Sequence, residues 1–219
     1  MQQTAEINIT GRGTVTSFPD GIQIDLSAIS ENVDYTECLS VLNVRVKNII
    51  DGVARAGTEE SVLTKSYAIT ELWSDQYDSQ KRKFQGYRAS QKLIVTIPLN
   101  TLLLGSIVQE LAKSDSNADM EISFVIRNME PLKREARIAA AAKAKESATD
   151  FAEATGLQLS SVKTITYTGG KNASNASLHV DSLSQYSVSS FDAVVPDEIS
   201  HDETVNIVWL AITKQAIKN

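Results

Sequence analysis

The chain has 219 residues, of which 42% are hydrophobic and 22% charged, and its formal net charge at pH 7 is −6. This length suits one large domain or two small ones, with roughly 70% of the unfolded chain's surface buried on folding. The negative charge argues against a nucleic-acid partner, whose phosphates repel an acidic surface. Cys38 is the single cysteine, so an intrachain disulfide is excluded, and its helical surroundings predict a buried or half-buried thiol.

The first third of the chain predicts two strands followed by a helix. Gly11-Arg12-Gly13 interrupts the first strand, and we interpret it as a bulge. Pro19-Asp20-Gly21 is a turn signal between the strands. The residues whose alternation predicts the two strands are Ala5, Ile7 and Ile9, then Ile22, Ile24 and Leu26.

The helix that follows is predicted from apolar residues that recur at spacings of three and four and form one stripe. Asn32 or Asp34 can cap its start, and Gly57 ends it. The stripe consists of Leu39, Leu42, Val46, Ile49, Ile50 and Val53.

The middle third predicts a long hairpin and a short helix. Residues 62–73 are rich in β-branched and aromatic side chains, and the polar residues 74–83 form the loop, with Lys81-Arg82-Lys83 as a solvated tip. Pro98 ends the returning strand because it has no N–H to donate, and Asn100 can cap the helix after it. The returning strand carries Tyr87, Ala89, Leu93, Val95 and Ile97 on one face, and the helix carries Leu103, Ile107 and Leu111.

An alanine-rich stretch in the last third predicts a long helix with a narrow face that lies close against another backbone. Pro131 suits its first turn, and Gly156 tolerates the left-handed conformation after its end. Alternating residues predict a strand at 120–126 before this helix, and an apolar segment predicts another at 162–167 after it.

The final strand, Val205 to Ile212, is apolar on both faces, so it is central in a sheet or covered by a partner. Residues 169–190 are rich in Gly, Ser and Asn and predict a flexible loop or insertion. Hairpin connections favour an α+β fold: mainly antiparallel sheets with two long amphipathic helices packed on one face, plus a short helix. We expect a single domain with two lobes, about residues 1–98 and 99–219.

The ordered set of these segments resembles the SIMPL-domain family over roughly residues 5–213. The resemblance implies an α+β fold and, for some members, large ring- or barrel-like oligomers and links to stress tolerance. It implies no catalytic residues, because none are established for the family. The segments that carry it are Ile9-Thr10-Gly11-Arg12-Gly13-Thr14-Val15 with Pro19-Asp20, Gly86-Tyr87-Arg88-Ala89-Ser90, Glu130-Pro131-Leu132 with the alanine-rich helix to Gly156-Leu157, and Val205-Asn206-Ile207-Val208-Trp209.

Candidate catalytic and metal-binding groups are few. The two histidines, His179 and His201, fall in polar stretches and are predicted at the surface, so we expect no catalytic residues, no metal and no cofactor. Gly169-Gly170-Lys171 lacks the following Ser or Thr and the helix of a phosphate-binding loop, so we interpret it as a flexible turn. Five acids without the glycine of a calcium loop predict a solvated face: Asp192, Asp197, Glu198, Asp202 and Glu203.

Four aromatic residues surround the predicted hairpin: Trp73, Tyr77, Phe84 and Tyr87. They are either cross-strand packing or an exposed anchor set for a partner. Together with Trp209 of the two-sided final strand, they form the candidate interface.

Three functions stay open on this sequence. The favoured one is a non-enzymatic, self-associating protein with a stress- or envelope-related scaffold role, a homo-oligomer with scope for a protein partner. The others are a binding module for a peptide or small ligand and a hydrolase that uses Ser, Asp and one histidine. The sequence contains no apolar run of about 18 residues, so we expect no transmembrane helix. No leader is evident before the first strand, so we expect a cytoplasmic location, or a periplasmic or envelope one if a leader has been removed.

Overall fold

The computed structural model describes residues 4–74, 82–114, 118–172, 177–180 and 196–213. The chain divides into two compact units. The first consists of the described residues within Met1–Phe18, Asn128–Ser174 and Glu198–Asn219, and the second of those within Pro19–Arg127 and Asn175–Asp197. Residue 98, where the sequence suggested a boundary between lobes, lies inside the second unit.

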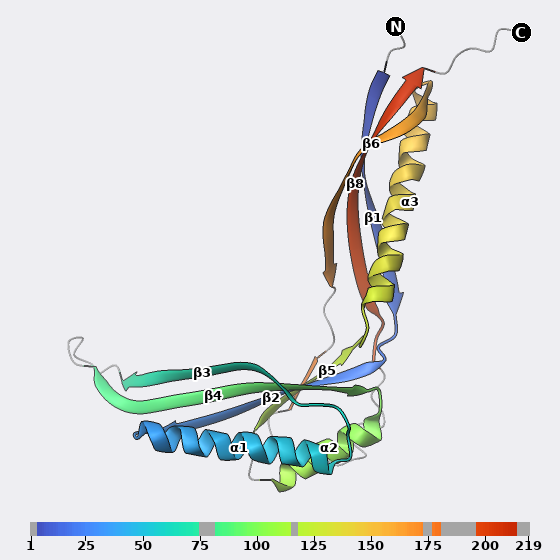
Figure 1. Ribbon diagram of the computed structural model, residues 1–219. Helices are drawn as coiled ribbons and strands as arrows, with labels where there is room; N and C mark the ends of the chain where they lie inside the picture. Colours follow the sequence, from blue (N-terminus) through green and yellow to red (C-terminus); the bar gives the residue numbers. More distant parts are fainter. Residues whose placement is uncertain (1–3, 75–81, 115–117, 173–176, 181–195, 214–219) are drawn as a thin grey trace, which may run out of the picture. The chain divides into compact units, whose positions relative to one another are not determined.

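The first unit is a three-stranded antiparallel sheet in the order β1-β8-β6, with α3 packed along one face (Figure 1). β8 pairs with β1 from Thr4↔Ile212 to Ser17↔Ile199 without a register shift. The final strand is therefore central, as predicted. The prediction of a bulge at Gly11-Arg12-Gly13 is wrong, because β1 keeps its register through these residues. The elements are β1 (Thr4–Ser17), α3 (Glu130–Ala154), β6 (Leu157–Asn172) and β8 (Ile199–Thr213).

The two glycines of β1 instead allow α3 to approach. A Cβ at Gly11 would lie 2.1 Å from the carbonyl oxygen of Ala140, and one at Gly13 would lie 2.1 Å from that of Ala136. No side chain fits between strand and helix at these points. The alanines that α3 buries at every fourth position are Ala136, Ala140, Ala144, Ala148 and Ala152. This confirms that the small-residue face of the helix lies close against another backbone.

The second unit is an antiparallel sheet in the order β3-β4-β2-β5-β7, with α1 and α2 on one face (Figure 1). The β3–β4 pair confirms the predicted long hairpin. The elements are β2 (Gly21–Asn32), α1 (Tyr35–Arg55), β3 (Leu63–Ser74), β4 (Lys83–Pro98), α2 (Thr101–Lys113), β5 (Asp119–Val125) and β7 (Ser177–Val180).

Both helices of the second unit begin at the caps that the sequence predicts. The side chain of Asp34 accepts a hydrogen bond of 2.8 Å from the N–H of Glu37, and that of Asn100 accepts one of 3.0 Å from Leu103. Cys38 is buried in the core between α1 and the sheet, as expected. Ile50, predicted in the apolar stripe of α1, is exposed because the helix turns it away from the sheet.

The architecture confirms the α+β prediction, with each long helix on one face of the sheet in its own unit. Residues 169–172 of the predicted loop form the end of β6, and residues 177–180 form β7. The remainder of the predicted 169–190 loop lies outside the described residues. Within the described residues, no helix is both long and apolar enough to cross a membrane.

Candidate functional site

Two ionisable side chains are buried together where the first turns of α3 cover β8. His201 is 3% exposed and Glu203 is 2% exposed, and the His201 Nε2 lies 3.0 Å from the Glu203 Oε1. They occupy the same face of β8 as Val205, Ile207 and Trp209. The surface location predicted for His201 and the solvated location predicted for Glu203 are therefore wrong. The inward alternation of β8 extends back to its first residue and turns both side chains toward the helix.

Tyr167 of β6 completes this polar cluster. Its hydroxyl donates a hydrogen bond of 2.7 Å to the Glu203 Oε2. β6 shifts register between Tyr167 and Gly169, and Gly169 has a φ of +80° that suits glycine. The segment interpreted as a flexible turn is thus a bulged part of a strand.

The Glu203 carboxylate fits beside β6 because Gly170 has no side chain. Gly170 lies opposite Glu203 in the sheet, and a Cβ there would stand 2.8 Å from the Glu203 Oε2. The same Cβ would lie 2.0 Å from the carbonyl oxygen of Asp202. Because of the bulge and Gly170, only backbone atoms of β6 lie beside the Glu203 carboxylate at this position.

Hydrogen bonds within the cluster shift the pKa values of Glu203 and Tyr167 in opposite directions. Burial would raise the pKa of Glu203, but the hydrogen bonds of His201 and Tyr167 and the nearby Arg137 outweigh it, so this pKa lies below its ordinary value. The hydrogen bond to Glu203, followed by burial and the carboxylate charge, raises the pKa of Tyr167. Glu203 is therefore ionised and Tyr167 protonated at neutral pH.

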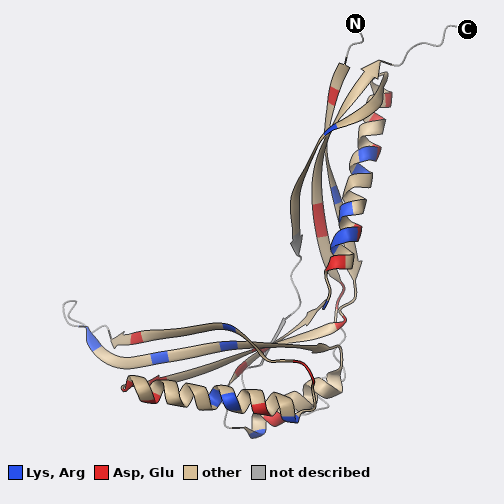
Figure 2. Ribbon diagram, in the orientation of Figure 1, with Lys and Arg blue, Asp and Glu red and all other residues tan. Residues whose placement is uncertain are grey.

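Two basic side chains of α3 border the same cavity, which has a volume of about 370 Å³. The Lys133 Nζ lies 3.3 Å from the Glu130 Oε1, and the Arg137 Nη2 lies 3.9 Å from the Glu130 Oε2. The side chain of Glu130 is 70% exposed. In Figure 2 both basic and acidic residues occur along the ribbon of α3. We define the His201 pocket by its lining residues: Glu130, Lys133, Arg137, Tyr167, Gly170, His201 and Glu203.

The opposite face of the same sheet carries an ion pair. Asp202 accepts hydrogen bonds from Arg12 and, at 2.5 Å, from Thr14 Oγ1. These hydrogen bonds hold the pKa of Asp202 below its ordinary value. Asp202 is half-buried in this pair, while Asp197 and Glu198 are exposed and Asp192 lies outside the described residues.

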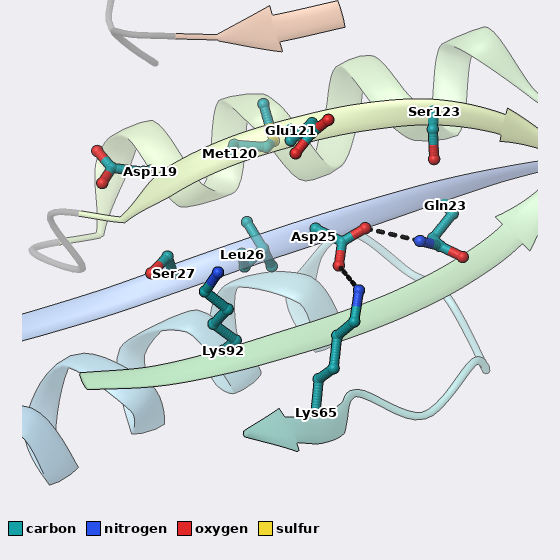
Figure 3. A pocket seen from close by; sticks show the side chains of 10 residues that line it. All are labelled: Gln23, Asp25, Leu26, Ser27, Lys65, Lys92, Asp119, Met120, Glu121 and Ser123. Atoms are coloured by element: carbon teal, nitrogen blue, oxygen red, sulfur yellow. Dashed lines mark hydrogen bonds and ion pairs between the residues drawn. The ribbon is translucent and has the colours of Figure 1, made fainter. Parts of the chain in front are cut away.

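The second unit has a polar hollow of about 570 Å³ on the sheet face opposite its helices (Figure 3). The Lys65 Nζ lies 2.9 Å from the Asp25 Oδ1, and the Gln23 Nε2 donates to the Asp25 Oδ2 at 2.7 Å. Its lining residues come from neighbouring strands. The charged ones are exposed or half-buried, unlike the buried pair in the His201 pocket, whereas Leu26, Met120 and Ser123 are buried. The lining residues are Gln23, Asp25, Leu26, Ser27, Lys65, Lys92, Asp119, Met120, Glu121 and Ser123.

The structure brings together three of the five aromatic residues of the candidate interface. The ring centroids of Trp73 and Phe84 are 5.3 Å apart and those of Phe84 and Tyr87 are 5.2 Å apart, all edge to face. Tyr35, which the sequence did not single out, joins Tyr87 at 5.3 Å. Trp73 is 49% exposed.

The other two aromatic residues of that set lie elsewhere. Trp209 is 5% exposed and packs beneath α3 within its own chain, so α3 covers this face of the final strand. Tyr77 lies outside the described residues. His179 belongs to β7, whose side chains are not described. Across the described ranges, no group of three or more His, Cys, Asp and Glu side chains is arranged to hold a metal ion.

Comparisons with known proteins identify the family. The family model described as SIMPL, protein of unknown function (DUF541), matches residues 7–209. The 26 kDa periplasmic immunogenic proteins of Brucella melitensis biotype 1 and Brucella abortus strain S19 are each 27% identical over 164 residues. That match covers 73% of this chain, and the chain spans about 65% of the length of either relative. Because the family model matches nearly the whole chain, this protein belongs to the SIMPL family.

Proposed function

We propose that this SIMPL-domain protein is a non-enzymatic scaffold that associates with a second copy of itself through strand β1. The proposal rests on one observation: β1 is a long, regular strand that is paired on one side only. β1 has 14 residues, pairs on one side with β8 in unbroken register, and has no described strand on its other side. A regular open edge presents a row of N–H and C=O groups that another strand can pair with.

The other long edge strands are built differently. β6 has three register shifts and carries Lys163, and β3 has two register shifts and carries Lys65. Bulges and edge lysines are the devices by which proteins discourage pairing along an edge. Among the long edge strands that the structure describes, β1 therefore favours association most.

The occupant we propose is β1 of a second copy. A two-fold axis places the same strand on both sides of the contact and gives an antiparallel pair. The charges of β1 are already engaged within the chain, because Glu6 contacts Lys163 and Arg12 contacts Asp202. No like charges of β1 are left to repel the matching strand.

The location that we propose is the periplasm or cell envelope. Support comes from the relatives in Brucella, whose printed names call them periplasmic. A stress-related role remains a prediction from the family resemblance.

Light scattering coupled to size-exclusion chromatography tests the scaffold proposal. We expect a species heavier than the 23.9 kDa monomer, converted to monomer by Thr16→Lys in β1. Thr164→Lys, at an exposed site on the bulged strand β6, is the matched control and should leave the oligomer intact. A single 23.9 kDa species for the unmodified chain at high concentration would refute the proposal.

A second candidate function, a binding module for a small ligand, is favoured by the His201 pocket. The specific observation behind it is that His201 and Glu203, buried and in hydrogen-bond contact at 3.0 Å, border a cavity.

A further inference from the structure

The buried His201–Glu203 pair interrupts an apolar surface. The face of β8 beneath α3 is otherwise apolar and carries Val205, Ile207 and Trp209. Well-packed apolar residues usually stabilise such a position as well as an ion pair does, because desolvation offsets most of the Coulomb attraction. Polar groups kept at this cost, beside a cavity, indicate a binding site.

Within the pocket, both carboxylate oxygens of Glu203 are already in hydrogen-bond contact. His201 contacts one carboxylate oxygen at 3.0 Å and the Tyr167 hydroxyl donates to the other at 2.7 Å. The carboxylate therefore fixes the positions of His201 and Tyr167 rather than being left to attract a cation.

The two basic side chains of α3 that line the pocket contact a different carboxylate. Lys133 and Arg137 share the carboxylate of Glu130, at 3.3 Å and 3.9 Å, and this carboxylate is 70% exposed. An exposed ion pair contributes little free energy, so a solvated glutamate is easily replaced. Arg137 also lies near Tyr167 and Glu203, which places its guanidinium at the cavity.

We propose that the His201 pocket binds a phosphate group between Lys133 and Arg137, and that this group takes the place of the Glu130 carboxylate. Arginine presents paired N–H donors that match phosphate oxygens, and lysine supplies a compact second charge. The bare backbone at Gly170 leaves the cavity of about 370 Å³ open beside them. The proposal rests on the binding-module function and does not depend on self-association.

Titration of the full chain with inorganic phosphate, followed by NMR shifts of the Arg137 and Gly170 amides, tests the site. We expect saturable shifts at both amides. Arg137→Gln should weaken binding roughly tenfold, the loss expected for one charge-assisted hydrogen bond. Lys133→Gln should weaken it in the same direction. Arg134→Gln removes an exposed charge from the same helix outside the pocket and should leave the affinity unchanged.

Glu130→Gln gives the sharpest result, because it removes the competing carboxylate and should strengthen phosphate binding several-fold. The proposal is overturned if the shifts do not saturate, if Arg134→Gln weakens binding as much as Arg137→Gln, or if Glu130→Gln weakens it.

Two further probes identify the source of the phosphate group. Glycerol 3-phosphate represents a free phosphomonoester, and phosphatidylcholine vesicles with and without phosphatidic acid represent a lipid headgroup. Arg137-dependent binding to either probe supports the site and names its source. If neither probe binds in an Arg137-dependent way, the proposal is wrong. Each assay is repeated on Thr16→Lys, so that a failure of self-association is seen separately from a failure of binding.

Discussion

Gly13 of β1 and Ala136 of α3 meet backbone to backbone, since a Cβ at Gly13 would lie 2.1 Å from the Ala136 carbonyl oxygen. The same Cβ would lie 2.5 Å from the N of Ala140. Both neighbours are backbone atoms, which cannot rotate away as a side chain end can. The spacing between strand and helix is therefore fixed by the smallest residue type on one side and the next smallest on the other.

Gly13→Ala should destabilise the first unit by about 3 kcal/mol, because overpacking against backbone forces the helix away from the sheet. Urea unfolding monitored by circular dichroism measures the change. Thr16→Ala, at an exposed site on the same strand, should stay within about 0.5 kcal/mol of the parent. An unchanged midpoint for Gly13→Ala would show that helix and strand are not in the contact described.

Ala144→Leu should cost about 2 kcal/mol or more, because Ala144 is fully buried between α3 and the sheet. Ala142→Leu places the same side chain on an exposed position of the same helix and should be close to neutral. Thermal unfolding of both variants gives the comparison. Equal losses at the two positions would contradict the four-residue periodicity of the buried face.

Removing one member of the His201–Glu203 pair should destabilise the protein more than replacing both members with leucine. Glu203→Leu alone is expected to lose about 3 kcal/mol, because it removes the carboxylate that the buried ring of His201 contacts at 3.0 Å. The double variant His201→Leu/Glu203→Leu should recover most of that loss through apolar packing with Val205 and Ile199. Urea unfolding of the single and double variants measures both. A double variant less stable than the single one would assign the pair a structural role.

The stability difference between the parent chain and Glu203→Gln should depend on pH. The pKa of Glu203 in the folded chain is lowered from 4.5, so its ionised form stabilises folding above that value. The contribution is lost as the pH falls from 4.5 through the lower folded pKa. Urea unfolding at a series of pH values from 7 down to about 3 should show the difference shrinking toward zero. A difference that grows on acidification would reverse the sign argued here.

Local features of this fold follow from the sequence. Asp34 and Asn100 are caps because their side chains reach the N–H three residues on, a relationship contained in a few consecutive residues. The small face of α3 likewise follows from its alanine spacing. The partner of that face does not follow, because the pairing of Gly11 and Gly13 with the helix joins distant parts of the chain.

The pattern of apolar residues in the last strand does not predict that His201 and Glu203 are buried, although the sequence contains a signal for it. Val205, Ile207 and Trp209 predict an inward face for the last strand, and counting back by two from Val205 reaches Glu203 and His201. Both are polar, so the strand was expected to begin after them. Ile199, two residues further back and buried, was the signal that the alternation continues. The β6 bulge that brings Tyr167 to Glu203 has no comparable mark in the sequence.

The pairing of β1 with β8 has a consequence for synthesis in the cell. Thr4 of β1 pairs with Ile212 of β8, so β1 lacks its neighbour until β8 (Ile199–Thr213) has been translated. The second unit draws most of its strands from consecutive segments and can form while translation continues. During that interval β1 has both edges open, and in a polysome the nascent β1 strands of neighbouring ribosomes are present at high local concentration.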